Sequence, residues 1–300
     1  MNTSEGKKIW LVGNSGMLGK QIEKELTKNN VEFAASDREV DITSFNEIND
    51  FIKNKNIDTI INCAAYTAVD EAEEKKEKAN KINSEGPKNL AKAAIKINAE
   101  LIHFSTDYVY SGEKKGKYTE EDKTDPLSVY GKSKLDGEKN IKNEMDRFFI
   151  IRLSWLYGVY GNSFVKTMVN LFQTHDELTV VNDQKGSPTY CGTLAENTVK
   201  LIRDNNRNYG VYNYSDGGEI SWYDFAVRIK KIADSIDKFK SNVSIKPIPS
   251  SEFPRKADRP KNSVMDKKKI KKYLNFKVKD WESNLIEYFK EWEKINYEGI

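Results

Sequence analysis

The chain of 300 residues is poor in cysteine and histidine, with two of each. Cys63 and Cys191 cannot build a disulfide scaffold in a chain this long, and their spacing is not that of a zinc module. No apolar run approaches the roughly 18 residues that a membrane-spanning helix needs. The residues before Ile9 are too polar for a secretory signal. These absences predict a reduced, cytoplasmic protein with no membrane partner.

An excess of charge of one sign is also missing, because 49 basic residues stand against 46 acidic ones and the net charge is +3. The two signs are interleaved, for example over residues 71–78, which is typical of a solvated helix face. The densest basic run, residues 267–272, is best explained as an exposed helix surface. A nucleic-acid partner requires a concentrated basic stripe, so we expect none and disfavour a basic-surface binding module.

Short apolar runs alternate with helical patterns through the first half of the chain. The pattern predicts strands at residues 9–12, 32–35, 59–61 and 101–104, and helices at 21–30, 45–53 and 83–97. This βαβ rhythm predicts an α/β protein with a Rossmann-type, doubly wound parallel sheet. After about residue 155 the rhythm loosens, and helical patterns return at 222–233 and 281–292. We therefore expect a dinucleotide-binding domain at 1–153 and a smaller C-terminal α/β substrate lobe at 154–300, from which some segments return to the first domain.

Three spaced glycines, Gly13, Gly16 and Gly19, stand where the first strand gives way to the first helix. Glycines at this place allow a tight turn, a close approach of the backbone to a diphosphate, and close packing of helix on strand. The N-terminus of the helix then offers free N–H groups and the positive end of its dipole. The spacing alone also suits a simple turn, but the strand–turn–helix context predicts a bound dinucleotide.

Asp37 follows the second predicted strand, 24 residues after Gly13. A carboxylate there accepts hydrogen bonds from the ribose hydroxyls of the adenosine and favours NADH. The neighbouring Arg38 argues for NADPH, because a guanidinium binds a 2′-phosphate. The pair also suits an exposed turn, so the choice between NADH and NADPH stays open. Asp41 and Ile42, just beyond, are placed to flank the adenine.

Tyr130 and Lys134 are four residues apart at the start of a predicted helix, so they share one face. A free phenol has a pKa of about 10, and a lysine cation stabilises the phenolate. Tyr130 is thus predicted to protonate the oxyanion that forms when a hydride reaches a carbonyl. The spacing arises easily by chance in a lysine-rich chain. The strand-like run 104–110 supports it, because the Thr106 hydroxyl can assist the proton transfer, although Ser105 and Thr106 also suit a simple strand cap.

Nine short segments, taken in order, carry a resemblance that covers the chain from about residue 7 to its end. They are residues 13–19, 62–73, 105–109, 129–134, 152–157, 162–168, 182–189, 221–226 and 259–263. With them the chain resembles an extended short-chain dehydrogenase/reductase, and more narrowly the dTDP-4-dehydrorhamnose reductase family. The resemblance implies reduction of the 4-keto group of dTDP-6-deoxy-L-lyxo-4-hexulose by NADPH or NADH to dTDP-L-rhamnose, a precursor for polysaccharide biosynthesis.

The resemblance also implies roles for single residues. Tyr130 becomes the proton donor, Lys134 its partner and Thr106 the tuning hydroxyl. The expected cofactor contacts are the glycine turn with Met17 and Leu18, then Asp37, Asp41, Ile42, Ala65, Tyr66, Thr67, Tyr130 and Lys134. The expected contacts to the sugar nucleotide are Thr106, Asp107 and Trp155, where Trp155 also suits a core position. Arg259 and Lys166 are candidate cations for the diphosphates.

Two departures from the family pattern bear on metal binding and on the cofactor site. Some members join two subunits through a magnesium ion held by glutamates, one of them two residues after the last glycine. Gln21 stands at that position, and its neutral amide is a poorer ligand for Mg²⁺. We therefore expect no metal, while a homodimer stays compatible with the resemblance. Tyr66 stands where the family usually has a histidine.

Several other functions remain open at this point. Sugar-nucleotide dehydratases resemble the chain too, but they have Thr-Asp-Glu where this chain has Thr106, Asp107 and Tyr108. The acid that water elimination needs is therefore missing. A reductase of a different nucleotide-linked 4-ketosugar is distinguished by pocket shape rather than by motif. A non-catalytic regulatory subunit on the same fold is disfavoured only because Thr106, Tyr130 and Lys134 are all present.

Overall fold

The computed structural model describes residues 8–236 and 239–297. The polar N-terminal segment, in which we expect no signal peptide, lies outside the described residues up to residue 7. Six parallel strands form the main sheet in the order β10-β5-β4-β3-β1-β2. Their bounds are β1 Ile9–Val12, β2 Phe33–Ser36, β3 Thr59–Asn62, β4 Glu100–Thr106, β5 Phe148–Leu153 and β10 Gly210–Tyr214.

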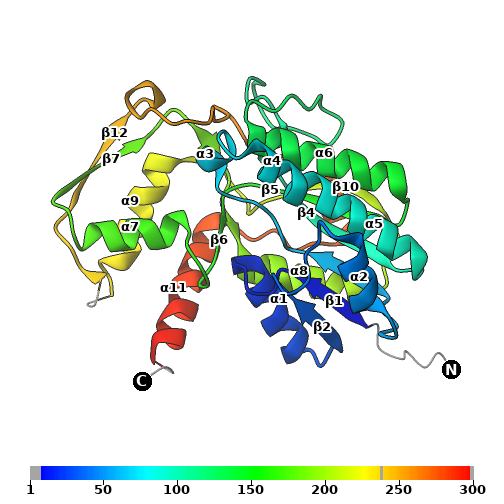
Figure 1. Cartoon of the computed structure of the whole chain (residues 1–300). Helices are drawn as coiled ribbons and strands as arrows, with labels where there is room; N and C mark the ends of the chain where they lie inside the picture. Colours follow the sequence, from blue (N-terminus) through cyan, green and yellow to red (C-terminus); the bar gives the residue numbers. More distant parts are fainter. Residues whose placement is uncertain (1–7, 237–238, 298–300) are drawn as a thin grey trace.

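Helices cover both faces of this sheet. Successive residues of a strand point to opposite sides, and the buried strands carry apolar residues on both. In β1, Ile9 and Leu11 belong to one apolar cluster, whereas Trp10 and Val12 belong to the other. The first cluster includes α1 (Met17–Lys28), α8 (Cys191–Arg203) and α10 (Lys268–Leu274). The second includes α2 (Phe45–Ile52), α5 (Gly86–Lys96) and α6 (Val129–Glu144). The predicted doubly wound α/β fold is confirmed (Figure 1).

A smaller body of helices and two-stranded sheets lies beside the main sheet, at the left of Figure 1. Its apolar core is built mainly by α7 (Phe164–Phe172), α9 (Trp222–Ala233) and α11 (Trp281–Tyr297). Its strand pairs are β6 (Leu156–Tyr157) with β9 (Thr189–Tyr190), β7 (Glu177–Val181) with β12 (Ser244–Ile248), and β8 (Lys185–Gly186) with β11 (Ile220–Ser221). Further short helices in the described ranges include α3 (Val69–Ala72), α4 (Lys76–Asn80) and η4 (Ser250–Glu252).

Segments from the second half of the chain return to the main sheet. β10 pairs with β5, and α8 packs against α1. A domain boundary after residue 153 stays a prediction. In that division, β10 and α8 would belong to the first domain.

The lysine-rich run forms part of α10, which buries Ile270 and Leu274 while Lys268, Lys271 and Lys272 are exposed. The predicted exposed helix surface is thus confirmed for these three lysines, whereas Lys267, the N-cap, and Lys269 are half-buried. Within the described ranges, no helix has the length and apolar character needed to cross a membrane.

Three predicted elements differ from the structure, and side-chain hydrogen bonds explain two of them. The strand predicted through residue 110 ends at Thr106, whose hydroxyl accepts a hydrogen bond from the Tyr108 N–H at 3.2 Å and begins the 3₁₀ turn η2 (Asp107–Val109). The helix predicted from residue 83 begins as a π-helical turn, η1 (Lys81–Glu85). There the Asn83 side chain bonds both the N–H and the carbonyl of Tyr66, at 2.8 and 3.0 Å. The first helix begins at Met17, four residues before its predicted start.

A buried ion pair joins α6 to β5. Arg152 and Glu138 are 3% and 0% exposed, and their closest contact is 2.6 Å. Ser105 of β4 donates a further hydrogen bond to Glu138, and the Tyr110 hydroxyl lies 2.8 Å from the guanidinium. Removing one partner of such a pair leaves the other charge buried without compensation.

We expect Glu138→Gln to lower the free energy of unfolding by about 3 kcal/mol, because Arg152 then loses its counter-charge inside the protein. Urea denaturation of the variant and the wild type measures this difference. The control is Asp136→Asn, which removes a solvent-exposed pair with Lys139 from the same helix and should leave stability nearly unchanged. Equal losses in both variants would contradict a special role for the buried pair.

Candidate active site

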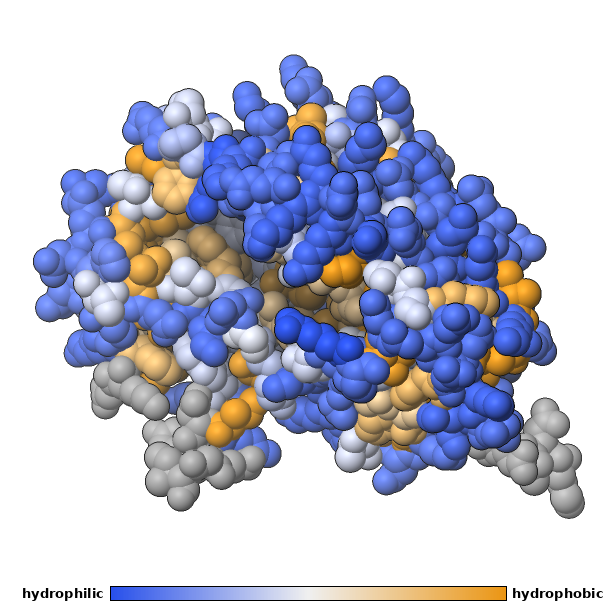
Figure 2. Space-filling model, in the orientation of Figure 1, coloured by the Kyte–Doolittle hydropathy of each residue, from blue (hydrophilic) through white to orange (hydrophobic). Residues whose placement is uncertain are grey.

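Two cavities in the described part of the chain are candidate sites, and one of these two lies at the carboxyl edge of the main sheet. This cavity measures about 540 Å³ and lies between the sheet and the smaller body. Figure 2 shows a hollow with an apolar floor and a hydrophilic rim near the middle of the molecule. The expected site residues that line the cavity are Gly16, Met17, Leu18, Ala65, Thr67, Thr106, Asp107, Tyr130, Lys134, Trp155 and Arg259.

The glycine turn forms one end of the cavity. Gly13 has φ +76°, and a Cβ there would lie 2.7 Å from the Ala64 nitrogen. A Cβ at Gly19 would lie 2.1 Å from the Gly13 oxygen, so both positions require glycine. Gly16 is the N-cap of α1, with no capping side chain and no acidic residue in the first turn. The first N–H groups of the helix therefore remain available to an anion.

The residues expected at the adenosine lie beyond this turn and outside the lining of the cavity. Asp37 directly follows β2 and accepts a hydrogen bond from the Ser15 hydroxyl, while Arg38 is exposed. Asp41 accepts a hydrogen bond from the Thr43 N–H at 2.8 Å, in the turn before α2. Ile42 is buried, and its side chain packs against Gly86 at the start of α5.

α6 carries Tyr130 and Lys134 into the cavity. The helix starts at its N-cap Ser128, whose hydroxyl accepts a hydrogen bond from the Gly131 N–H at 3.1 Å. Lys134 is 2% exposed and donates a hydrogen bond to the Phe104 carbonyl at 2.6 Å. Its Nζ also lies 3.3 Å from His103 Nε2. Burial lowers the pKa of Lys134 to about 8, although the Glu138 charge acts in the opposite direction.

Tyr130 holds its proton in this environment. Burial raises the pKa of its phenol, the Thr106 hydroxyl acts against this, and the Asp107 charge adds to it. The structure differs here from the expectation that Lys134 lowers this pKa, because the ammonium is directed to the Phe104 carbonyl. A phenol that is protonated at neutral pH is in the state that a proton donor needs.

Asp107 lies beside these groups at the start of η2. Its Oδ1 accepts a hydrogen bond from the Thr106 hydroxyl at 3.0 Å. Burial raises the pKa of Asp107 to about 6, while hydrogen bonding to Ser263 and Thr106 opposes the rise. The carboxylate is therefore held among polar partners at the wall of the cavity.

Trp155 forms an apolar wall of the cavity together with Trp222 from the first turn of α9. The two indoles stack with centroids 3.5 Å apart and planes at 10°. Trp155 has φ +48°, a left-handed conformation that is uncommon for a bulky residue and is often found at functional sites. A Cβ at Gly186 would lie 2.4 Å from the Trp155 ring, so the glycine leaves room for the indole.

Other expected residues lie away from the cavity wall. The Tyr66 side chain packs with Ala72 and Ala79 and does not line the cavity, whereas its neighbours Ala65 and Thr67 do. Lys166 is a half-buried residue of α7 and is also absent from the lining set.

Gln21 lies in a polar cluster between α1 and α11. Its Nε2 donates a hydrogen bond to Glu291 Oε1 at 3.1 Å, and Lys24 Nζ lies 2.6 Å from the same oxygen. The Tyr190 hydroxyl donates to the other oxygen of Glu291. Burial raises the pKa of Glu291, but the hydrogen bonds from Lys24, Tyr190 and Gln21 outweigh it and lower the pKa overall. Glu291 is thus a carboxylate already neutralised by a lysine.

Sequence reasoning missed several residues that line the cavity. They are Cys63, Val69, Phe104, Ser105, Tyr108, Leu153, Leu156, Asn162, Phe164 and Trp222. Tyr108 directly follows Asp107 in a segment that the resemblance already marks, so its position was a usable signal. Trp222 also lies in a marked segment, residues 221–226, but only the packing of α9 shows that its indole meets Trp155.

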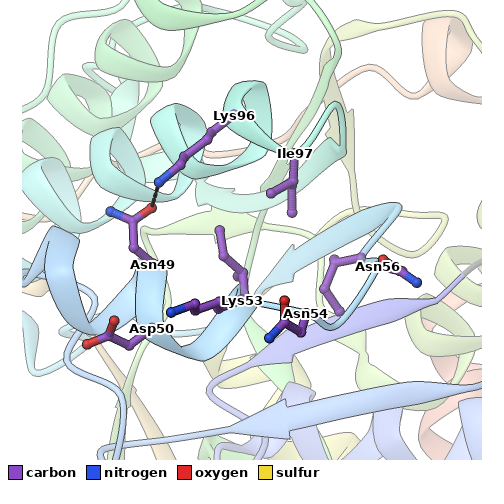
Figure 3. Close-up of a pocket in the computed structure, with 9 residues that line it drawn as sticks. Asn49, Asp50, Lys53, Asn54, Asn56, Lys96 and Ile97 are labelled. Carbon is purple, nitrogen blue, oxygen red and sulfur yellow. Dashed lines mark hydrogen bonds between the residues drawn. The ribbon is translucent and has the colours of Figure 1, made fainter.

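The second cavity lies at the opposite edge of the sheet, between the ends of α2 and α5 (Figure 3). It measures about 480 Å³, and Lys96 donates a hydrogen bond to Asn49 across it at 3.1 Å. Its lining includes Asp50, Lys53 and Asn54 but none of the expected site residues. Ligands of open α/β sheets bind at the carboxyl edge, so the first cavity is the candidate active site.

A parallel sheet with a glycine turn after its first strand and a Tyr-x-x-x-Lys pair over its carboxyl edge defines the class of the short-chain dehydrogenases/reductases. Within this class, the family model described as the RmlD substrate binding domain matches residues 7–294. The chain therefore belongs to this family, and the predicted resemblance is confirmed.

Three relatives illustrate this membership. The dTDP-4-dehydrorhamnose reductase of Aggregatibacter actinomycetemcomitans is 39% identical over 284 residues, which cover 93% of this chain and 97% of that protein. The crystal structure of a dTDP-4-dehydrorhamnose reductase from Clostridium acetobutylicum has a TM-score of 0.90 and 43% identity, covering 95% of this chain and 99% of that one. The corresponding protein from Bacillus anthracis, in complex with NADP, has a TM-score of 0.89 and 37% identity with the same coverage.

The lowered pKa of Lys134 predicts a pH dependence of stability. The pKa is about 8 in the folded protein, against the ordinary lysine value of 10.5, so between these pH values the unfolded chain binds one more proton. Stability due to Lys134 therefore rises with pH across this window, by about 3 kcal/mol. Relative to Lys134→Met, the wild type should gain this amount between pH 7.5 and pH 10.5 in urea denaturation.

The matched control is Lys132→Met, which removes an exposed lysine of the same helix. A pH dependence of the same size in this control would show that the effect does not come from Lys134.

Proposed function

We propose that the protein reduces the 4-keto group of dTDP-6-deoxy-L-lyxo-4-hexulose with NADPH or NADH to give dTDP-L-rhamnose. The observation that carries this proposal is the convergence of Thr106, Tyr130 and Lys134 in the cavity that begins at the glycine turn of α1. The full-length similarity to dTDP-4-dehydrorhamnose reductases supports the choice of substrate. We further propose that the enzyme works in the cytoplasm, with Cys63 and Cys191 as free thiols.

The residues along the cavity fit a dinucleotide. The uncapped N-terminus of α1 would bind its diphosphate through the backbone of Gly16, Met17 and Leu18. Asp37 and Arg38 would meet the adenosine end, and Ala65 and Thr67 lie along the way to Lys134. When bound, the reduced nicotinamide supplies a hydride. An ammonium has three N–H donors, of which the Phe104 carbonyl engages one, so Lys134 can still donate to a cofactor in the cavity.

Tyr130 would donate the proton that the reduction requires. Its raised pKa keeps the phenol protonated at neutral pH, and the Thr106 hydroxyl beside it lowers the cost of ionisation as the proton leaves. Lys134 donates to the Phe104 carbonyl, so we assign its charge to the cofactor rather than to the phenol. Tyr130 and Thr106 would therefore deliver the proton to a carbonyl oxygen placed next to Tyr130.

The opposite wall would bind the sugar nucleotide. The stacked Trp155 and Trp222 offer a flat apolar surface to the face of a deoxysugar. Asp107 accepts hydrogen bonds from sugar hydroxyls, and Arg259 supplies a cation for the diphosphate. Lys166 lies outside the lining set, so we assign the diphosphate to Arg259 instead.

A magnesium ion does not fit the cluster around Gln21. Mg²⁺ takes an octahedral set of oxygen ligands, usually one or two carboxylates completed by waters. Here Glu291 is paired with the Lys24 ammonium, and among the residues of the described ranges no group of three or more histidine, cysteine or acidic side chains could hold a metal. We propose that the enzyme needs no divalent cation and that any homodimer forms without a shared one.

The proposed function is tested by following NADPH and NADH oxidation with enzymatically generated dTDP-4-keto-6-deoxy-L-sugar. Parallel reactions with other nucleotide-linked 4-ketosugars measure the selectivity. We expect substrate-dependent loss of absorbance, with the highest kcat/KM for the dTDP-linked sugar. No turnover with either cofactor would refute the proposal, and faster turnover of another nucleotide sugar would reassign the substrate.

Tyr130→Phe removes the proton donor while keeping the ring. We expect kcat to fall by at least about a hundredfold, since a positioned acid contributes about this factor or more. NADPH affinity, measured by fluorescence titration, should change less than twofold. A parallel loss of cofactor binding would indicate structural damage and contradict the assigned role.

Chelation tests the absence of a metal requirement. We expect EDTA followed by desalting to leave kcat/KM and the thermal midpoint unchanged, because Lys24 already neutralises Glu291. Loss of activity that added Mg²⁺ restores would overturn this proposal.

A further inference from the structure

Asp70 of α3 joins the two parts of the protein at the mouth of the active-site cavity. We name residues 255–259 the strap; this segment crosses from the smaller body to α3 (Figure 1). The Ala257 N–H donates a hydrogen bond to Asp70 Oδ1 at 3.2 Å, and Arg259 donates from Nη2 to Oδ2 at 3.1 Å. Arg255 lies 3.8 Å from the same Oδ2. One carboxylate thus holds both the backbone and a side chain of the strap.

Arg259 lies on the wall of the cavity next to the proposed proton donor. Its Nη1 lies 3.5 Å from the Tyr108 hydroxyl, and the Tyr108 ring packs edge-on against Tyr130 with centroids 5.7 Å apart. Among the described residues that line the cavity, only Lys134 and Arg259 carry a positive charge. Lys134 is 2% exposed and is assigned to the cofactor, whereas the Arg259 side chain is 25% exposed. A substrate diphosphate entering the cavity therefore meets Arg259.

We propose that Asp70 is a positioning residue, which holds Arg259 ready to bind the diphosphate of the sugar nucleotide. This inference rests on the proposed function for the identity of the ligand. It assigns a task to a residue that does not line the cavity, although its neighbour Val69 does. Arg259 would bind the diphosphate with its remaining N–H donors, while Asp70 and Tyr108 keep the guanidinium in place.

Two effects of Asp70 on diphosphate binding oppose each other. Its negative charge repels the diphosphate, but the side chain is 31% exposed, so water screens this repulsion. Its two hydrogen bonds order both a long, flexible arginine and the strap before the ligand arrives. Without them, part of the binding free energy would be lost in ordering these groups. A planar guanidinium that is already oriented binds a phosphate with little further loss of freedom. The ordering effect therefore prevails.

Asp70→Asn tests the proposal with little change of shape. The asparagine oxygen can still accept the Ala257 hydrogen bond, but an N–H group replaces the acceptor of Arg259. We expect the KM for the sugar nucleotide to rise about tenfold, the size of one charge-assisted hydrogen bond. The kcat and the KM for NADPH should change less than twofold. Asp70→Glu should recover part of the loss, because it restores the negative charge.

Glu74→Gln is the matched control, because it removes the neighbouring pair between Glu74 and Lys256 of the strap. Both side chains of that pair are well exposed, and neither lines the cavity. The control should leave every kinetic constant unchanged. An equal rise of KM in this variant would mean that general loosening of the strap, and not Arg259, causes the effect.

Calorimetric binding of dTDP and of thymidine tests the same idea without turnover. Asp70→Asn should weaken dTDP about tenfold and leave thymidine unchanged, since only dTDP carries the diphosphate. Equal effects on both ligands, no effect on dTDP, or tighter dTDP binding would overturn the proposal, as would a wild-type protein that does not bind dTDP. Wild-type binding of dTDP without turnover of any ketosugar would refute the proposed function alone.

Discussion

Glu138 on α6 and Arg152 on β5 form an ion pair that water does not reach. Sliding α6 along the sheet or lifting it away would leave both charges buried and unpaired, at a cost of several kcal/mol. Tyr130, Lys134 and Glu138 are spaced by four residues, so they lie along one stripe of the helix. The pair that fixes Glu138 therefore also fixes where the phenol and the ammonium meet the carboxyl edge of β4.

The cavity exists because two parts of the chain meet above this edge. The sheet contributes the glycine turn and the Tyr130–Lys134 pair, while the smaller body contributes Trp222 and Arg259. Trp155 accepts an uncommon backbone conformation between them, supported by the stacked indole and by the space beside Gly186. Strained residues held in this way are often found where a ligand must meet a rigid surface.

Burial explains the protonation states of the catalytic groups. The same low-dielectric surroundings raise the pKa of Tyr130 and lower that of Lys134. Both shifts disfavour charge in the cavity, so a reaction that moves a proton there depends on the few polar partners that remain, chiefly Thr106 and the Phe104 carbonyl. The sequence motif identifies the pair of residues, and the surroundings decide how strongly each one holds its proton.

Local sequence patterns encode the parallel α/β sheet, the glycine turn and the Tyr130–Lys134 pair, because each depends on spacing within one or two neighbouring elements. The sequence also carried the resemblance to the RmlD family. The π-helical turn at Asn83, the partner of Trp155 in Trp222, and the contact of Asp70 with Arg259 came only from the tertiary structure. These features join residues that lie far apart along the chain. The packing of helices and strands brings such side chains together, and no local sequence pattern shows which ones will meet.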